Sequence, residues 1–301
     1  MMKSCIVTSA VAVIALSLAI LPAIAQQGGA DPSAVIKQEA AKPTPRLADG
    51  HPNMTGFWAA DRTKLSFFAV PVQVSADGKT VVYAERDAPE LDARAQPNFK
   101  ARAADKSRRP PYKPEFVTKQ RELMYTASRV DPGIHCYPAG VPRIGAPSEI
   151  VHTPGTIYLM YADERDEDQT HTFRIVPIGA KHKPDEDPVP DGHSVAFWEG
   201  DTLVVDVTNI DPETWLSGDG DFHDENLHVI ERFTRKGNTL EYDVTIEDPT
   251  LFTGPWKPVL GQVQGRIGSQ TRILREPGAH ATPDYPCVER DREHKVNNDR
   301  F

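Results

Sequence analysis

The chain has 301 residues, with 34 lysines and arginines against 43 aspartates and glutamates, and a net charge of −9 at pH 7. This acidic balance, without a basic run interleaved with aromatic residues, argues against nucleic acid as a partner. Beyond an apolar run near the N-terminus, we expect no membrane span in the mature chain.

The first 25 residues predict a secretory signal. An apolar run from Cys5 to Pro22 is followed by Ala23-Ile24-Ala25, which places small residues where a signal peptidase reads them. The run is short for an uncleaved membrane anchor, which is the alternative. We therefore expect a periplasmic or secreted protein, cleaved near Ala25.

Removal of this segment leaves two cysteines, Cys136 and Cys287. A pair of cysteines in an exported chain most often forms a disulfide, because that compartment is oxidising. We expect one bond between them, and a catalytic thiol is the alternative.

The mature chain divides into a linker and one domain. Residues 26–50 are rich in Ala, Pro and Lys without a hydrophobic period, which predicts a disordered linker. Residues 51–301 are expected to form a single domain with an irregular excursion near 86–111. One helix is predicted over 113–129, because Pro114 suits a first helical turn and apolar residues recur on one face.

After residue 147, short β-branched and aromatic runs alternate with turn signals, which is typical of antiparallel hairpins. The expected strands cover 149–153, 156–161, 170–177, 194–198, 202–208, 227–235, 239–247 and 261–275, with 56–58 and 66–74 upstream. So many consecutive hairpins close into a barrel or a sandwich to hide their edges. We expect an antiparallel barrel, with sites on its long rim loops.

The hairpin around residues 237–238 carries a charged residue in an apolar alternation. With Gly237-Asn238 as a two-residue loop, Phe233 opposes Tyr242 and Glu231 opposes Val244. Directly opposed residues share a face, so Glu231 is predicted to point into the barrel, while His228, opposite Glu247, lies on the outer face. A carboxylate there must be paired, protonated or in a polar cavity. Two roles remain open: an ion pair with an arginine (Arg143, Arg174 or Arg272), or a general base.

Two histidines are candidate proton partners of Glu231. His171 alternates with Phe173 and Ile175, which predicts an inward side chain, either hydrogen-bonded in the core or catalytic. His223 lies on the long loop 211–226 and is either solvated or placed at the barrel mouth. We expect no metal site, because His228 and Glu231 are three apart on a strand and project from opposite faces.

Other residues are candidates for binding. Arg143 ends the rigid stretch HCYPAGVPR and is either an anion anchor or a clamp at the barrel end. Trp215, Phe233 and Tyr242 could line an aromatic pocket or form core. The chain lacks the G-x-S-x-G, H-E-x-x-H, P-loop and dinucleotide-glycine patterns, so we expect no cofactor.

Residues 51–294 contain the blocks CYPAGVPR, FWEGDTLVVDVTNID, FHDENLHVIERFTR, LEYDVTIEDP and DYPC. Together these blocks resemble a large family of exported bacterial proteins, most of which have no assigned activity, and the resemblance covers that whole range. The tetrapeptide TGFW at 55–58 is also similar to the Gly-x-Trp opening of lipocalin-like barrels. That likeness implies an interior cavity for a small apolar molecule, although a fold does not settle chemistry.

The sequence thus predicts a cofactor-free lyase or isomerase that performs elimination, isomerisation or hydration/dehydration on a small apolar or aromatic molecule. Glu231 would be the base, His223 or His171 its proton partner, and Tyr242 a hydrogen-bond donor. A periplasmic binding or carrier protein without turnover is the alternative. A metal-dependent enzyme that uses His223 and His228 is a third possibility.

Overall fold

The structure is a computed structural model that describes residues 32–59, 72–74, 81–83, 109–135, 137–161, 172–183, 186–260 and 267–275. The predicted signal peptide, His171, Cys136, Cys287 and most of the 86–111 excursion lie outside these residues. The inward orientation expected of Phe173 and Ile175, on which the prediction for His171 rested, is wrong, because the two residues are 64% and 57% exposed. Within the described part of the chain, no helix is long and apolar enough to cross a membrane.

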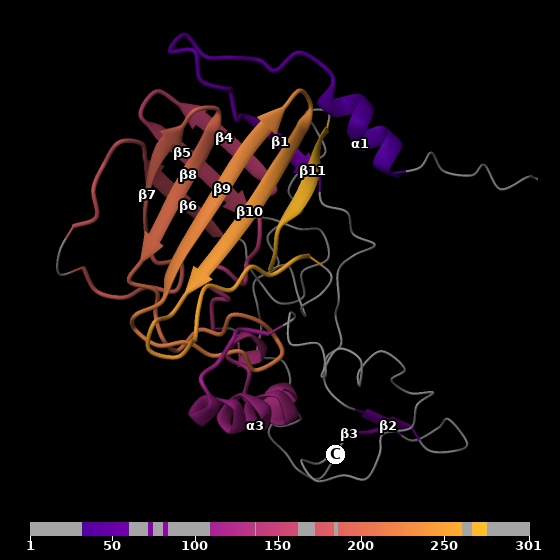
Figure 1. Ribbon diagram of the computed structural model, residues 1–301, viewed down its shortest axis with the longest axis vertical. Helices are drawn as coiled ribbons and strands as arrows, with labels where there is room; N and C mark the ends of the chain where they lie inside the picture. The colour runs from indigo at the N-terminus through magenta and orange to yellow at the C-terminus, as the bar shows by residue number, and fades with distance from the viewer. Residues whose placement is uncertain are drawn as a thin grey trace, which may run out of the picture.

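Nine strands form one barrel-shaped sheet (Figure 1). They are β1 (Gly56–Ala59), β4 (Glu149–Thr153), β5 (Thr156–Tyr161), β6 (Thr172–Pro177), β7 (His193–Glu199), β8 (Thr202–Thr208), β9 (His228–Lys236), β10 (Thr239–Glu247) and β11 (Gln270–Arg275). A separate hairpin pairs β2 (Val72–Val74) with β3 (Val81–Tyr83), and β3 was not predicted from the sequence.

The strands follow one another around the barrel in chain order, as expected of a meander. The sheet runs β6-β5-β4-β1-β11-β10-β9-β8-β7, so the first and last strands of the barrel, β1 and β11, are neighbours. Their antiparallel ladder pairs Trp58 with Leu274 and joins the two halves of the meander. The predicted antiparallel barrel is confirmed.

The barrel is nearly closed, and its seam lies between β6 and β7. Because nine is an odd number, eight antiparallel pairings leave these two strands pointing the same way. They meet through a single parallel bridge, Ile178 with Ala196. Two parallel neighbours need a long connection rather than a tight turn, and residues 178–192 join β6 to β7. The described residues of this segment, 178–183 and 186–192, hereafter the crossover, lie along the outside of the barrel.

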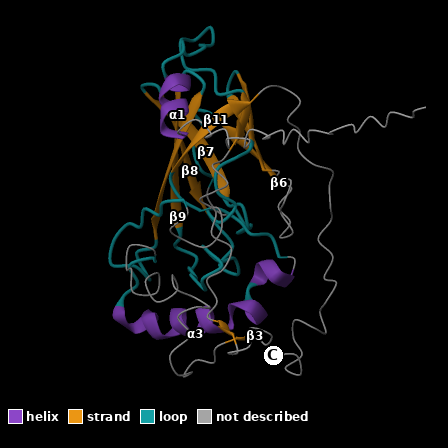
Figure 2. Cartoon of the chain, turned by 90° about the vertical axis from the view of Figure 1, so that its right-hand side faces the viewer, coloured by secondary structure: helices purple, strands orange, loops and turns teal. Residues whose placement is uncertain are grey.

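Helices lie at the two ends of the barrel (Figure 2). Helix α3 (Pro114–Val130) follows the sequence prediction closely and continues into the 3₁₀ turn η3 (Pro132–His135). Helix α1 (Pro32–Ala40) lies within the stretch that the sequence analysis expected to be a disordered linker. It is held on the β9–β10 turn, where the Asn238 backbone N–H donates to the Glu39 carbonyl at 3.0 Å. A partner at the turn thus orders a segment whose own composition favours no structure.

The register predicted for β9 and β10 is confirmed. Phe233 opposes Tyr242 and Glu231 opposes Val244. All four side chains are at most 2% exposed, and they share the barrel interior with the other core residues. Alternation of side chains along both strands therefore separates an apolar inner face from a charged outer face.

Candidate functional site

The inward carboxylate of Glu231 belongs to a polar network that crosses the barrel. Its Oε2 accepts a hydrogen bond from Arg174 Nη1 at 2.7 Å, and its Oε1 accepts one from the Tyr242 hydroxyl at 3.0 Å. Arg174, on edge strand β6, also donates to the Tyr161 hydroxyl at 2.8 Å and to Ser194 Oγ at 2.7 Å. Since Ser194 lies on β7, Arg174 links the two strands at the seam.

Burial and charge pairing set the protonation states of this network. Burial alone would lower the pKa of Arg174, but the adjacent Glu231 carboxylate raises it far above its ordinary value. Burial, reinforced by Glu231, raises the pKa of Tyr242 well above its ordinary value. The tyrosine therefore stays a hydrogen-bond donor, and the arginine stays charged.

This geometry favours the ion-pair role for Glu231 among the two that the sequence left open. The two side chains of the pair are 4% and 1% exposed, and both carboxylate oxygens have partners. Phe233 packs against Tyr242 with ring centroids 5.1 Å apart and is fully buried. Of the predicted site residues, the structure thus brings Glu231, Tyr242 and Phe233 together, within a packed interior.

His223 lies in a different network, on the loop between β8 and β9. Its Nδ1 is 2.9 Å from the Asp224 carbonyl oxygen, and its Nε2 is 2.8 Å from Thr214 Oγ1. A carbonyl oxygen only accepts, so Nδ1 carries the proton in the neutral ring, and the single Thr214 hydroxyl proton is shared between Nε2 and the Asp211 carbonyl oxygen, which lies 2.9 Å from Oγ1. Burial lowers the pKa of His223, which favours that neutral form.

Arg143 and Trp215 are both engaged in contacts within the fold. Arg143 makes a bidentate pair with Asp131 at 2.6 and 2.7 Å, which ties its loop to the end of α3. This matches the clamp that the sequence analysis weighed against an anion anchor. Trp215 is 8% exposed and forms an isolated bridge with Phe222.

A second buried acid, Asp221, lies where the β8–β9 loop meets α3. Its Oδ2 accepts from Ser217 Oγ at 2.5 Å and its Oδ1 from Gln120 Nε2 at 3.1 Å. Arg109 Nη1 is 3.8 Å away. Burial raises the pKa of this fully buried carboxyl to about 6, against the lowering effect of Arg109. The sequence analysis assigned no role to Asp221.

The outer face of the barrel carries a chain of ionisable side chains. Asp206 on β8 lies between two histidines: its Oδ2 is 3.0 Å from His228 Nε2, and its Oδ1 is 2.8 Å from His182 Nε2. His228 Nδ1 is 3.5 Å from Glu247 Oε2, across the β9–β10 ladder. The four side chains are between 25% and 40% exposed, so solvent and small molecules can reach them.

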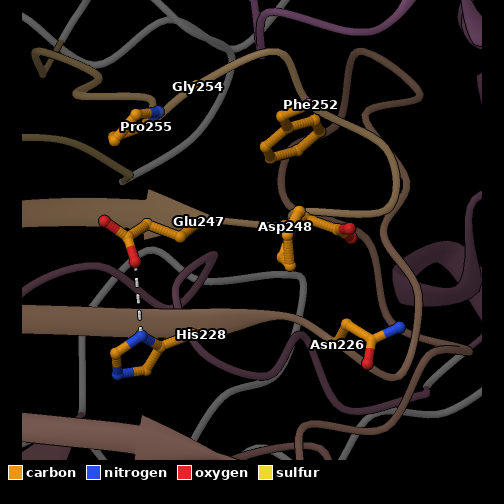
Figure 3. Close-up of a pocket in the computed structure, with 8 residues that line it drawn as sticks. Asn226, His228, Glu247, Asp248, Phe252, Gly254 and Pro255 are labelled. Atoms are coloured by element: carbon orange, nitrogen blue, oxygen red, sulfur yellow. Dashed lines mark ion pairs between the residues drawn. The ribbon is translucent and has the colours of Figure 1, made fainter.

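A pocket of about 360 Å³ opens beside this chain of residues (Figure 3). Its lining consists of Asn226, His228, Glu247, Asp248, Pro249, Phe252, Gly254 and Pro255. Asp248 is fully engaged in shaping the wall, because its carboxylate accepts from the backbone N–H groups of Asp224, Thr250 and Leu251. His228 and Glu247 point toward one another from adjacent strands and are the titratable groups it leaves accessible.

Hydrogen bonding fixes the tautomer of the neutral His228 ring and favours its charged form. An ionised carboxylate only accepts, so Nε2 carries the proton that is donated to Asp206, and Nδ1 is the variable nitrogen. The hydrogen bond from His228 holds the pKa of Asp206 below its ordinary value. The same bond raises the pKa of His228 against the opposing effect of burial. The paired carboxylate therefore favours the charged form of the ring.

The sequence analysis placed His228 opposite Glu247 on the outer face but did not predict an acid–base site there. The missing partners were Asp206 and His182, because the 211–226 loop hides the β8–β9 register and the crossover path cannot be read from the chain. One signal was present: Asp206 is out of phase with the apolar alternation Leu203, Val205 and Val207.

The described residues contain no group of three or more His, Cys, Asp or Glu side chains placed to hold a metal ion. In particular, the structure holds His223 and His228 in separate networks rather than at one centre. Comparison of the chain with known protein families, with curated proteins and with solved structures found no match.

Proposed function

We propose that this protein is an exported, cofactor-free acid–base catalyst and that His228 is its catalytic residue. The observation that carries the proposal is the hydrogen bond of His228 Nε2 to Asp206, which leaves Nδ1 at the pocket and 3.5 Å from Glu247. A carboxylate behind one ring nitrogen orients the imidazole and stabilises its charged form. The other nitrogen is then free to take up and return a proton.

The chemistry that fits this arrangement is proton transfer at a bound small molecule. His228 Nδ1 would remove a proton from one atom of the substrate and return it at another, which is an isomerisation. In a dehydration, the ring would remove a proton from one carbon, and a proton would be delivered to the hydroxyl that leaves the neighbouring carbon as water; hydration is the reverse. General acid–base catalysis of this kind typically contributes ~10²–10⁴-fold in rate.

The pocket wall indicates the substrate class. Pro249, Phe252 and Pro255 offer apolar surface, while Glu247 and the Asn226 side-chain oxygen can accept hydrogen bonds. We infer a small molecule with an apolar or aromatic body and a hydroxyl or amine that donates. Anions are disfavoured, because Asp206 and Glu247 both flank the imidazole.

Binding without turnover is the second candidate, and the locked Glu231–Arg174 pair is what we expect of such a carrier. An interior ion pair with every oxygen satisfied leaves the barrel core no chemistry to perform. In that case the outer pocket would bind the same class of molecule, and His228 would only hydrogen-bond it.

Solvent-deuterium exchange separates the two candidates. The purified protein is incubated in D₂O with a panel of phenols, aromatic ketones and terpenoid alcohols, and deuterium incorporation is measured by mass spectrometry. We expect exchange in at least one compound, and its loss by ~10²-fold or more in His228→Gln. His193→Gln is the matched control, because His193 pairs with Glu186 away from the pocket. Thermal stabilisation by a compound without exchange would support the carrier. Exchange that survives in His228→Gln would overturn the proposed site.

A further inference from the structure

The crossover brings a second histidine to the site from outside the β8–β9–β10 surface. Because β6 and β7 are parallel, the connection between them must return along the sheet, and the contact of His182 with Asp206 places the crossover over the outer face. The crossover is attached to β8 and its extension: Asn209 Nδ2 donates to the Glu186 carbonyl at 2.9 Å, and the Val189 N–H donates to the Asn209 carbonyl at 3.1 Å. These contacts hold His182 over the outer face of β8.

We propose that His182 is a positioning residue for His228, acting through the carboxylate that the two histidines share. The catalytic half of this inference rests on the proposed function. His182 Nε2 donates to Asp206 Oδ1 at 2.8 Å, while His228 Nε2 donates to Oδ2 at 3.0 Å. Two donors on the two oxygens of one carboxylate fix its rotation. This fixes the direction from which His228 is held.

The position of His182 is itself set by the strand beneath it. Its Nδ1 lies 3.3 Å from Thr208 Oγ1, two residues beyond Asp206 on the same face of β8. Both ring nitrogens of His182 therefore have partners on β8. The result is a continuous line of hydrogen-bonding groups from Thr208 through His182 and Asp206 to His228.

Sharing one carboxylate also couples the two histidines electrostatically. The charged or titratable groups that face His228 are Asp206 from β8, Glu247 and Asp248 from the end of β10, and His182 from the crossover. On β9 itself, Arg232 is engaged by Glu199. Two imidazolium ions on one carboxylate repel each other, so a proton on His182 opposes a proton on His228.

Nuclear magnetic resonance of ¹⁵N-histidine-labelled full-length protein tests this coupling without any substrate. His182→Gln keeps an N–H donor near the position of Nε2 but cannot carry the charge. We expect this change to raise the measured pKa of His228 by roughly half a pH unit and to leave its Nε2–H tautomer intact. His182→Ala removes the donor, and the neutral ring of His228 should then show a mixture of Nε2–H and Nδ1–H tautomers. His193→Gln, at the first residue of β7, should change neither quantity.

Turnover supplies the second readout. In the deuterium-exchange assay we expect His182→Ala to lower kcat by ~10–100-fold with little change in KM, and His182→Gln to restore most of it. An unchanged His228 titration and tautomer in both His182 variants would overturn the inference. If the two histidines are coupled but no compound exchanges deuterium, the proposed catalytic function is refuted, while the positioning of His228 by His182 through Asp206 is supported. If His182→Ala does not fold, the titration of His182→Gln still decides.

Discussion

Substitution of Glu231 by glutamine tests how the barrel interior is held together. The amide keeps the shape of the side chain and an oxygen that can accept from Tyr242. Its other end, however, now presents an N–H donor to the Arg174 guanidinium, where Oε2 accepted a bond at 2.7 Å. Arg174 keeps its bonds to Tyr161 and Ser194, but its charge is left buried without a counterion.

The expected loss follows from the burial of the pair. With side chains 4% and 1% exposed, solvent cannot replace the missing carboxylate. Breaking a buried pair on one side costs ~3–5 kcal/mol in free energy of unfolding. Because Arg174 also spans the seam, we expect part of the loss as easier separation of β6 from β7.

Urea unfolding followed by tryptophan fluorescence measures the loss, with the urea dependence expected to stay constant while the midpoint falls. The double variant Glu231→Leu/Arg174→Met is the matched control. Removing both charges together should recover most of the stability, because no buried charge is stranded. A Glu231→Gln protein with wild-type stability would refute the ion-pair reasoning. If the Glu231→Gln protein kept wild-type stability but lost deuterium exchange, Glu231 rather than His228 would be the acid–base group.

Three further predictions concern titration and the cysteines. The pKa of Asp221, raised by burial to about 6, means that this carboxyl stabilises the fold at low pH and that its contribution is lost as pH rises through about 6. Asp221→Asn should therefore gain stability relative to the wild type between pH 4 and 7, by up to ~3 kcal/mol in chemical denaturation. Asp206→Asn should lower the pKa of His228. Since a raised histidine pKa stabilises below the unfolded value of ~6.5, the stability lost through His228 should be largest in mildly acid solution and shrink as pH rises. Thiol titration of the unfolded, unreduced mature protein should find Cys136 and Cys287 both bonded, and two free thiols would remove the disulfide prediction.

The sequence predicted the fold well where local rules apply. Gly237-Asn238 fixes the hairpin loop, and the loop fixes the register that places Glu231 inside and His228 outside. Strand β3 and helix α1 were missed for a different reason. The isolated three-residue strand β3 carries too short a pattern to be recognised, and α1 owes its position to contacts with a turn about 200 residues later.

The candidate site was predicted less well, because the alternation along a strand predicts which face a side chain points to but not which residue it contacts. The same alternation that placed Glu231 inside left three arginines as possible partners, and only the closed barrel selects Arg174. On the outer face, the ladder identified Glu247 opposite His228, whereas Asp206 depends on a register hidden behind a long loop. The position of His182 depends on the whole sheet, because it follows from the sheet having an odd number of strands. An odd number of strands forces a parallel seam, a parallel seam forces a crossover, and the crossover passes over β8 beside Asp206. An extra strand pairing antiparallel between β6 and β7 would remove the need for the crossover, and His182 would then have no route to the site.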